Sequence, residues 1–189
     1  MSCINKIVKE IVNNCSTTPV SGLETTIYLF NRTDIEQIDY DVVNTSLITG
    51  IDLASTSPAT TGYKLIGTKK ALNAGFERVI AEDMPDMFKH KLVFSGFEFD
   101  SASIENFDQL GDLVAIVERK DKNNVDGTFV AYGINTGLFI STDTYMANDN
   151  NGVRKIEMDT MDGQLEKHSQ NNVVIGDYKA TKDFLEALM

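Results

Sequence analysis

Short runs of β-branched and aromatic residues, separated by turn-forming residues, fill most of this chain. The clearest run is HKLVFSGFEFD, His90–Asp100, where Leu92 and Phe94 share one face and Val93 shares the other with the later phenylalanines. Such period-two alternation predicts a β-strand. Gly96 within it predicts a bulge or a close backbone approach. A chain built from such runs must fold mainly by pairing strands.

Other runs extend this pattern along the sequence. Residues 25–31 are rich in β-branched and aromatic side chains, and residues 63–88 predict one or two strands that end at Pro85. LVAIVERKD, which starts at Leu113, predicts a buried strand, and Asp126-Gly127 is a strong hairpin signal. These strands favour an antiparallel framework.

Three short helices are expected beside the strands. Residues 4–12 have the spacing of an amphipathic helix that either caps the core or docks on a neighbour. A second helix begins with Ser101 or Ser103 as N-cap, has Ile104, Phe107 and Leu110 on one side, and ends at Gly111. Phe184, Leu185 and Leu188 predict a short C-terminal helix. The predicted fold is mainly β (α+β): one domain over residues 1–189, built as an antiparallel two-sheet sandwich or barrel with flanking helices.

The charge balance limits the possible partners. Formal net charge is -11 over 189 residues. This argues against a protein that grips nucleic-acid phosphates over its whole surface, and against a binder of anionic membranes. No apolar run reaches the roughly 20 residues that span a bilayer. The N-terminus lacks the apolar centre of a signal peptide, so we expect a protein made and used without Sec export.

The sequence gives no positive signal for a metal or a cofactor. Cys3 and Cys15 form no CxxC pattern and are interpreted as ordinary thiols. NDNNG, Asn148–Gly152, superficially resembles a calcium loop, but the first and twelfth positions would be Ala147 and Met158, which lack a carboxylate. We therefore expect no metal and no cofactor.

Catalytic motifs are also absent from the sequence. The two histidines, His90 and His168, are isolated, and we interpret them as structural or surface residues. Many carboxylates could serve acid–base or glycosidase chemistry, although each lies in a turn-like context where aspartate is expected. They are Asp83, Asp86, Asp143, Asp149, Asp159 and Asp162. The sequence predicts a protein that is not an enzyme.

Two uncharged segments need an explanation. Residues 45–62 are rich in Ser, Thr, Gly and Pro and poor in charge, yet Leu47, Ile48, Ile51 and Leu53 require burial. We expect an extended loop or hairpin that lies on another surface. VAYGINTGLFIST, Val130–Thr142, places its apolar residues on one parity and Gly133 and Gly137 on the other, which predicts a strand pressed closely against something.

An ordered set of motifs in this chain resembles the tail-tube and neck-ring proteins of tailed phages. The motifs run from FKHKLVFSGFEFD through DQLGD, VAIVE and YGINTGL to the acidic-asparagine loop and KIEMDT. The segment GLETTIYLFNRTDI is similar to the first strand of such proteins. The negative charge and the glycine-rich character of the sequence resemble those of proteins from crAss-like phages. The resemblance covers most of the chain and rests on an ordered set of weak motifs. It implies two packed antiparallel sheets with a flanking helix, subunits closed into a ring, and sheets that line a DNA channel.

The resemblance also implies roles for particular residues. Residues 45–62 would form an inter-subunit arm that buries Leu47, Ile48, Ile51 and Leu53 on a neighbour. Gly133 and Gly137 would permit close approach of a neighbouring subunit or element, and the loop DTYMANDNNG would lie at the edge of the ring. Because a channel that passes DNA must not bind it, the lumen would be lined by acidic and neutral groups. The candidates are Asp143, Asp149, Glu157 and Asp159, for which a solvated outer face is the alternative.

The expected partners are copies of the chain in a ring and other tail, neck or portal proteins. DNA would pass without specific binding, no membrane would be involved, and the protein would be made in the host cytoplasm and reside in the virion. A neck ring of a short-tailed phage and a tube of a long flexible tail stay open. A small ligand-binding β-barrel or sandwich protein and a hydrolase with paired aspartates are the alternatives from other classes.

Overall fold

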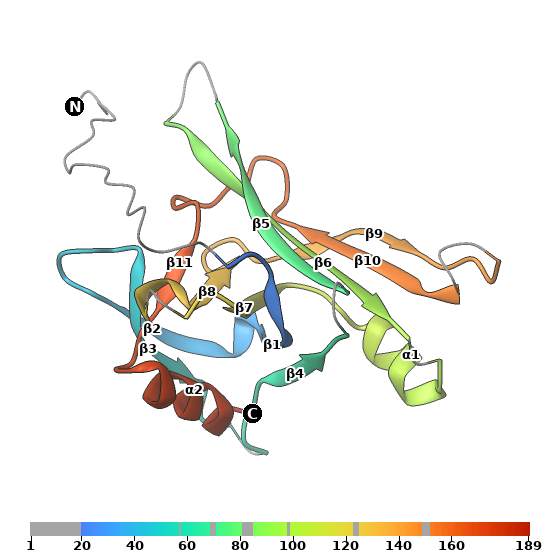
Figure 1. Cartoon of the computed structure of the whole chain (residues 1–189), viewed down its shortest axis with the longest axis horizontal. Helices are drawn as coiled ribbons and strands as arrows, with labels where there is room; N and C mark the ends of the chain where they lie inside the picture. Colours follow the sequence, from blue (N-terminus) through green and yellow to red (C-terminus); the bar gives the residue numbers. More distant parts are fainter. Residues whose placement is uncertain are drawn as a thin grey trace.

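The computed structural model describes residues 20–56, 58–68, 71–80, 85–97, 99–122, 125–148 and 152–189. These residues form a seven-stranded sheet, a four-stranded sheet and the helices α1 and α2 (Figure 1). The prediction of a mainly-β, two-sheet fold is confirmed. The sheets do not close into a barrel. The helix expected at residues 4–12 lies outside the described residues.

The seven-stranded sheet has the order β2-β3-β11-β8-β7-β1-β4, and its neighbouring strands are antiparallel except for β11 and β3. Its strands are β1 (Leu23–Asn31), β2 (Ile35–Tyr40), β3 (Leu47–Leu53), β4 (Tyr63–Ile66), β7 (Leu113–Arg119), β8 (Phe129–Tyr132) and β11 (Asn171–Val173). Two 3-10 turns, η1 (Arg32–Asp34) and η2 (Val125–Gly127), lie between strands. The second turn stands in the β7–β8 hairpin that Asp126-Gly127 predicted.

Both faces of the seven-stranded sheet are covered. Ile27 on β1 and Ala115 on β7 belong to the core that faces the four-stranded sheet. Tyr28 and Ile116 alternate with them and face the core beneath α2. Since neither face is left to water, the segment from Leu113 to Glu118 is buried at every position. This explains why β7 reads as a continuous apolar run.

The four-stranded sheet has the order β5-β6-β10-β9 and is fully antiparallel. Its strands are β5 (Leu72–Val79), β6 (Met87–Gly96), β9 (Phe139–Thr144) and β10 (Arg154–Asp159). Leu92, Phe94, Ile156 and Met158 point into the core between the sheets. The alternate residues form the opposite face, which we call the open face; the side chains of Lys91 and Glu157 there are 49% and 34% exposed, and that of Asp159 is 15% exposed.

The helices stand at opposite sides of the fold. α1 (Ser101–Asp108) follows β6, and its N-cap is Asp100, whose carboxylate accepts from the backbone of Ala102 and Ser103. The expected caps Ser101 and Ser103 are therefore wrong, because the carboxylate one residue earlier satisfies the first-turn donors. α2 (Tyr178–Ala187) covers the seven-stranded sheet with buried Leu185, so the predicted C-terminal helix is confirmed.

The segment predicted as an inter-subunit arm, residues 45–62, supplies a strand of the molecule's own sheet. Leu47–Leu53 is β3, paired with β2 and β11. Ile48 and Ile51 are 0% and 1% exposed in the core beneath α2, and Leu53 packs against that core. The expectation that Ile48, Ile51 and Leu53 bury themselves on a neighbour is wrong, because this chain already packs them in its own core. Leu47 is half-buried, and its contact with a neighbour stays a prediction.

The bent segment Val130–Thr142 is not one strand. β8 ends at Tyr132, the chain turns, and β9 continues in the other sheet. Gly133 and Gly137 have φ values of 73° and 79°, which side-chain-bearing residues rarely adopt. A Cβ on Gly133 would lie 2.7 Å from Cγ of Leu138. The predicted close approach is present, and of the two expected neighbours, a subunit or an element, it is an element of the same chain at the turn that joins the two sheets.

Candidate functional site

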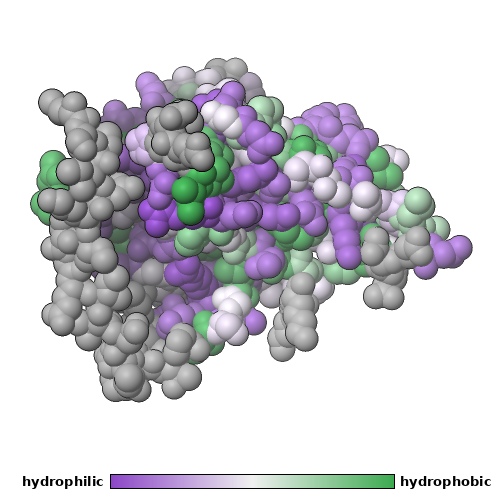
Figure 2. Space-filling model, turned by 90° about the horizontal axis from the view of Figure 1, so that it is seen from above, coloured by the Kyte–Doolittle hydropathy of each residue, from purple (hydrophilic) through white to green (hydrophobic). Residues whose placement is uncertain are grey.

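The open face of the four-stranded sheet holds two of the four predicted lumen residues, Glu157 and Asp159. Strand alternation places Glu157 and Asp159 of β10 on this face, together with Lys89 and Lys91 of β6. Lys91 Nζ lies 2.7 Å from Glu157 Oε2, and Lys89 Nζ lies 4.0 Å from Asp159 Oδ2. Figure 2, viewed from the side of this sheet, shows a mostly hydrophilic surface.

Two lysines of this face, Lys89 and Lys91, are matched by carboxylates from three segments, whereas exposed Lys155 of β10 has no ion pair among the described residues. Lys89 also binds Asp162, at 2.9 Å, and it lies opposite Glu77 of β5 in the strand register. The hydrogen bond from Lys91 to Glu157 raises the pKa of the lysine, which stays protonated. The face therefore carries interleaved charges of both signs and not the mainly acidic surface expected for a lumen.

The four candidate lumen residues do not share one face. Asp143 of β9 lies opposite Ile156, on the side of the sheet that turns away from the open face. Its carboxylate accepts from Nε and Nη2 of Arg154, at 2.8 and 2.6 Å. Asp149 lies outside the described residues. Only Glu157 and Asp159 remain as neighbours on the open face, because Asp143 pairs with Ile156 and shares its side of the sheet.

A buried polar junction connects the two sheets behind the open face. His90 of β6 is fully buried, and its Nδ1 accepts from the backbone N–H of Gly133, 3.0 Å away. Its Nε2 lies 2.9 Å from the carbonyl oxygen of His168. Since Nδ1 accepts, the proton of the neutral ring is on Nε2, which donates to that carbonyl. Burial lowers the pKa of His90.

Glu166 is the second member of this junction. Its fully buried carboxylate accepts from the backbone N–H groups of Asn135 and Thr136, at 2.8 and 2.9 Å. The side chains of the same two residues donate to it as well. The turn between Gly133 and Gly137 thus forms a small nest of donors, and a carboxylate of this chain occupies it. The junction connects the two sheets, and the Glu166 carboxylate already occupies the N–H groups that could otherwise bind an external anion.

Neither histidine has the geometry of a catalytic base with a complete set of partners. Both ring nitrogens of His90 are engaged in the buried junction. His168 Nε2 lies 3.3 Å from Thr45 Oγ1, a nucleophile–base distance, but among the described residues no carboxylate hydrogen bonds to its Nδ1. Burial is the main cause of the lowered pKa of His168. The described residues contain no group of three or more His, Cys, Asp or Glu that could hold a metal ion.

Two surface hollows accompany these features. One, of about 330 Å³, is lined by Ser46, Phe88 and the segment Lys167–Gln170. The other, of about 340 Å³, lies beside Gly22, Ala74 and Arg119. Their linings mix polar and apolar groups. Neither is the apolar enclosed cavity that a small-ligand β-barrel would require.

Sequence reasoning missed Glu166 and Arg154. Glu166 stands in a polar stretch, DGQLEKHSQNN, in which nothing marks one carboxylate as buried. Arg154 follows the acidic loop, and its partners Asp108 and Asp143 are far away in sequence. The only available signal for Glu166 was the pair of glycines around Asn135 and Thr136, which is typical of a turn with exposed N–H groups.

Comparison with known proteins identifies no relative: no protein-family model, curated protein or solved structure matches this chain. Neither helix among the described residues combines the length and the apolar character needed to cross a membrane.

Proposed function

We propose that this chain is a ring-forming structural subunit of a phage tail or neck, with the open face of the four-stranded sheet lining a channel for DNA. In this proposal the chain performs no chemistry. The resemblance of its ordered motifs to tail-tube and neck-ring proteins motivates the proposal. The structural observation that supports it is a sheet with one face in the core and the other face polar, partly exposed and carrying charges of both signs.

Charge balance on the open face suits a wall that DNA passes. Each cation that contacts a phosphate adds affinity and salt dependence to DNA binding. Lys89 and Lys91 are held by carboxylates of the same face, at 2.9 and 2.7 Å. A phosphate that approached either lysine would have to displace a carboxylate and would meet the remaining negative charge. These two pairs weaken the retention of DNA, and Lys155 is the cation of this face that has no ion pair among the described residues.

The strand order of the four-stranded sheet also suits assembly. β5 and β9 are its edge strands, and each has one side that no described strand pairs. Edge strands are the parts of a β-protein that extend a sheet into another chain. Repeated edge contacts, turned by a constant angle, close into a ring. The other edge strands, β2 and β4, belong to the sheet that α2 covers.

The alternative of a small ligand-binding β-protein has less support. Its binding site would be an enclosed apolar cavity between the sheets. The space between the sheets is filled by large side chains, among them Phe94, Leu92 and Tyr132, which are at most 2% exposed. The two hollows lie beside this core and have mixed linings.

The proposal is tested with the full-length chain and two charge variants. Sedimentation velocity at rising concentration should detect a closed oligomer, and its binding to a short labelled DNA duplex at low salt should be negligible. The variant Glu157→Lys/Asp159→Lys should keep the oligomer and gain DNA binding that salt removes. Glu36→Lys/Asp52→Lys adds the same charge at exposed positions of β2 and β3 and is the matched control.

Two results would reject the proposal. A chain that remains monomeric at every concentration does not form rings by itself. Equal gains of DNA binding in the two variants would show that DNA does not contact the open face more than the rest of the surface.

A further inference from the structure

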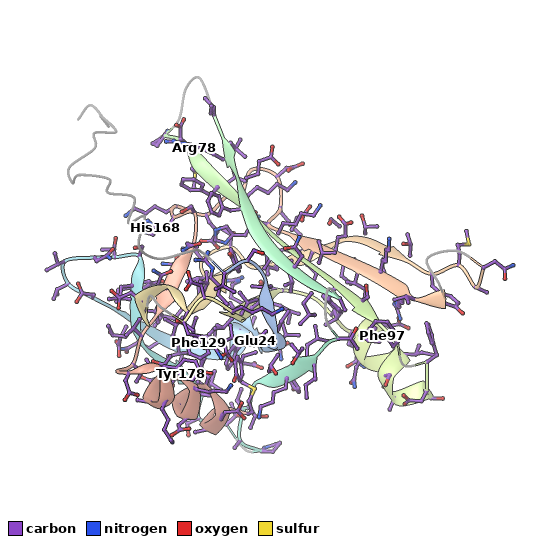
Figure 3. The ribbon with its side chains drawn as sticks, viewed as in Figure 1. Glu24, Arg78, Phe97, Phe129, His168 and Tyr178 are labelled. Carbon is purple, nitrogen blue, oxygen red and sulfur yellow. The ribbon has the colours of Figure 1, made fainter. Side chains whose placement is uncertain are left out.

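Large apolar side chains gather at one end of the four-stranded sheet. Phe97, Phe99, Tyr145 and Met146 are 50%, 40%, 47% and 62% exposed, and we call these four residues the aromatic end. Single exposed apolar residues are normal on protein surfaces, whereas a cluster with a polar rim marks an interaction site. Figure 3 shows Phe97 beside α1, at the opposite end of the sheet from Arg78.

The strand directions bring the two parts of the aromatic end together. β6 and β9 are both antiparallel to β10, which lies between them, so their C-terminal ends are at the same end of the sheet. The residues that follow these ends include Phe99 and Tyr145. Their ring centroids are 4.6 Å apart. Two segments more than forty residues apart in sequence therefore build one surface.

Helix α1 is fastened beside this surface by Arg154. The guanidinium binds Asp108 of α1 at 2.7 Å and Asp143 of β9 at 2.6 Å, and it lies over the ring of Phe107, 5.4 Å from its centroid. That ring packs closely on Gly96, where an added Cβ would lie 2.7 Å from it. The surface is thus held in a defined shape before any partner arrives, which lowers the entropic cost of binding.

The rim of the aromatic end is acidic. No Lys, Arg or His occurs between Leu92 and Glu118 in the sequence. Asp100, Glu105 and Asp108 are exposed in this stretch. Hydrogen bonds from Ser103 lower the pKa of Asp100, so its charge persists at neutral pH. Two cations lie nearby: Arg154 is shared by Asp108 and Asp143, and exposed Lys155 lies between Ser95 and Thr144. The carboxylates still outnumber the cations, which leaves the rim with excess negative charge.

We propose that the aromatic end is a docking surface for another protein, whose matching patch carries lysine or arginine side chains beside aliphatic ones. Aromatic faces attract cations, and exposed carboxylates steer and hold them. The acidic rim repels nucleic acids and anionic membranes.

A second copy of the chain fits this description poorly. At the far end of the sheet, Arg78 and Lys89 are bound to Asp86 and Asp162, so among the described residues Lys167 is the exposed cation without an ion pair there. The partner is therefore a different protein, and the inference goes beyond the proposed ring.

The test uses the full-length chain and synthetic peptide probes that carry one tryptophan. The chain itself has no Trp, so the fluorescence of the probe reports binding selectively. One probe alternates lysine with leucine, a second replaces each lysine with glutamate, and a third replaces each leucine with serine. We expect saturable binding of the lysine–leucine probe alone, with affinity that falls as salt is raised.

Variants locate the binding surface. Phe99→Ser/Tyr145→Ser should weaken binding of the lysine–leucine probe at least about tenfold, because both rings leave the contact. Asp100→Asn/Glu105→Gln should weaken it about threefold and remove most of the salt dependence, and asparagine still caps α1. The matched control is Val42→Ser/Val43→Ser, which removes apolar side chains that are 98% and 88% exposed elsewhere. It should leave binding unchanged.

Several outcomes would overturn the proposal. These are equal binding of the glutamate probe, an equal loss in the Val42 and Val43 variant, or no loss in the aromatic variant while its thermal unfolding is unchanged. Loss of self-association in the aromatic variant without any probe binding would instead assign the surface to a second copy. The ring proposal is judged separately, by the mass of the wild-type chain alone.

Discussion

At the scale of single residues, the His90 ring ties the two sheets together through both of its nitrogens. Nδ1 accepts from Gly133 in the crossover turn, and Nε2 donates to His168 in the segment before β11. Tyr132 contacts the ring edge-on, with centroids 5.2 Å apart, and the charge of Glu166 lies nearby. A second proton on Nδ1 would point at the N–H of Gly133. The fold therefore requires the neutral ring.

This requirement predicts a specific pH dependence. The folded-state pKa of His90 lies below the ordinary 6.5, because burial outweighs the attraction of Glu166. Below pH 6.5 His90 binds a proton in the unfolded chain but stays neutral in the folded chain. The free energy of unfolding therefore falls as pH falls. The slope is at most about 1.4 kcal/mol per pH unit for one proton. Urea unfolding between about pH 7 and pH 5 measures it, above the range in which most carboxylates titrate.

His90→Gln isolates the contribution of this ring. The glutamine amide can accept from Gly133 and donate to His168 but does not titrate, so the slope should become shallower. His168→Gln is the matched control and should change the slope less, because His168 is only half-buried. Identical slopes in the wild type and in His90→Gln would contradict the assignment of a neutral His90 ring that stays unprotonated in the folded state.

At the scale of elements, the turn between β8 and β9 decides how the chain passes from one sheet to the other. Gly137 has φ of 79°, and a Cβ there would collide with the carboxylate of Asp112. That carboxylate forms a two-pronged ion pair with Arg32, at 2.6 to 2.9 Å. A side chain at position 137 would therefore have two effects: it would strain the backbone, and it would displace the ion pair between Asp112 and Arg32.

Gly137→Ala should therefore lower the free energy of unfolding by about 2–4 kcal/mol, measured by denaturant unfolding. Gly163→Ala is the matched control, since Gly163 has φ of 81° and open space around the Cβ position. It should cost about 1 kcal/mol, the strain alone. Equal costs at the two positions would mean that the contact with Asp112 is unimportant.

Strand β3 gives the second prediction at this scale. Because Ile51 is buried in the core beneath α2, Ile51→Ala should cost about 2–5 kcal/mol of unfolding free energy. Val43→Ala, on the exposed β2–β3 turn, should change it by less than about 0.5 kcal/mol. Thermal and urea unfolding compare the two. A fold that tolerates Ile51→Ala as well as Val43→Ala would restore the idea of an arm that detaches from its own core.

At the scale of the whole molecule, the strands that alternate or lie fully buried, such as β6 and β7, could be predicted from the sequence because burial follows a local period. β3 and β11 could not, since their pairing is parallel and joins residues more than 100 positions apart. The site divides in the same way. Glu157 and Asp159 share a strand face, as period two requires. The position of Asp143 depends on its pairing with Ile156, and that of Glu166 on a distant turn, and a single sequence reveals neither.

In the proposed assembly, copies of this chain close into a ring whose channel is lined by the open face. Electron cryomicroscopy of the concentrated, full-length chain tests it most directly, because one reconstruction gives both the closure and the orientation of each subunit. We predict closed rings in which Lys91 and Glu157 face the channel and β5 and β9 face neighbouring subunits. Particles that remain single subunits, or rings in which this face turns outward, would contradict the claim.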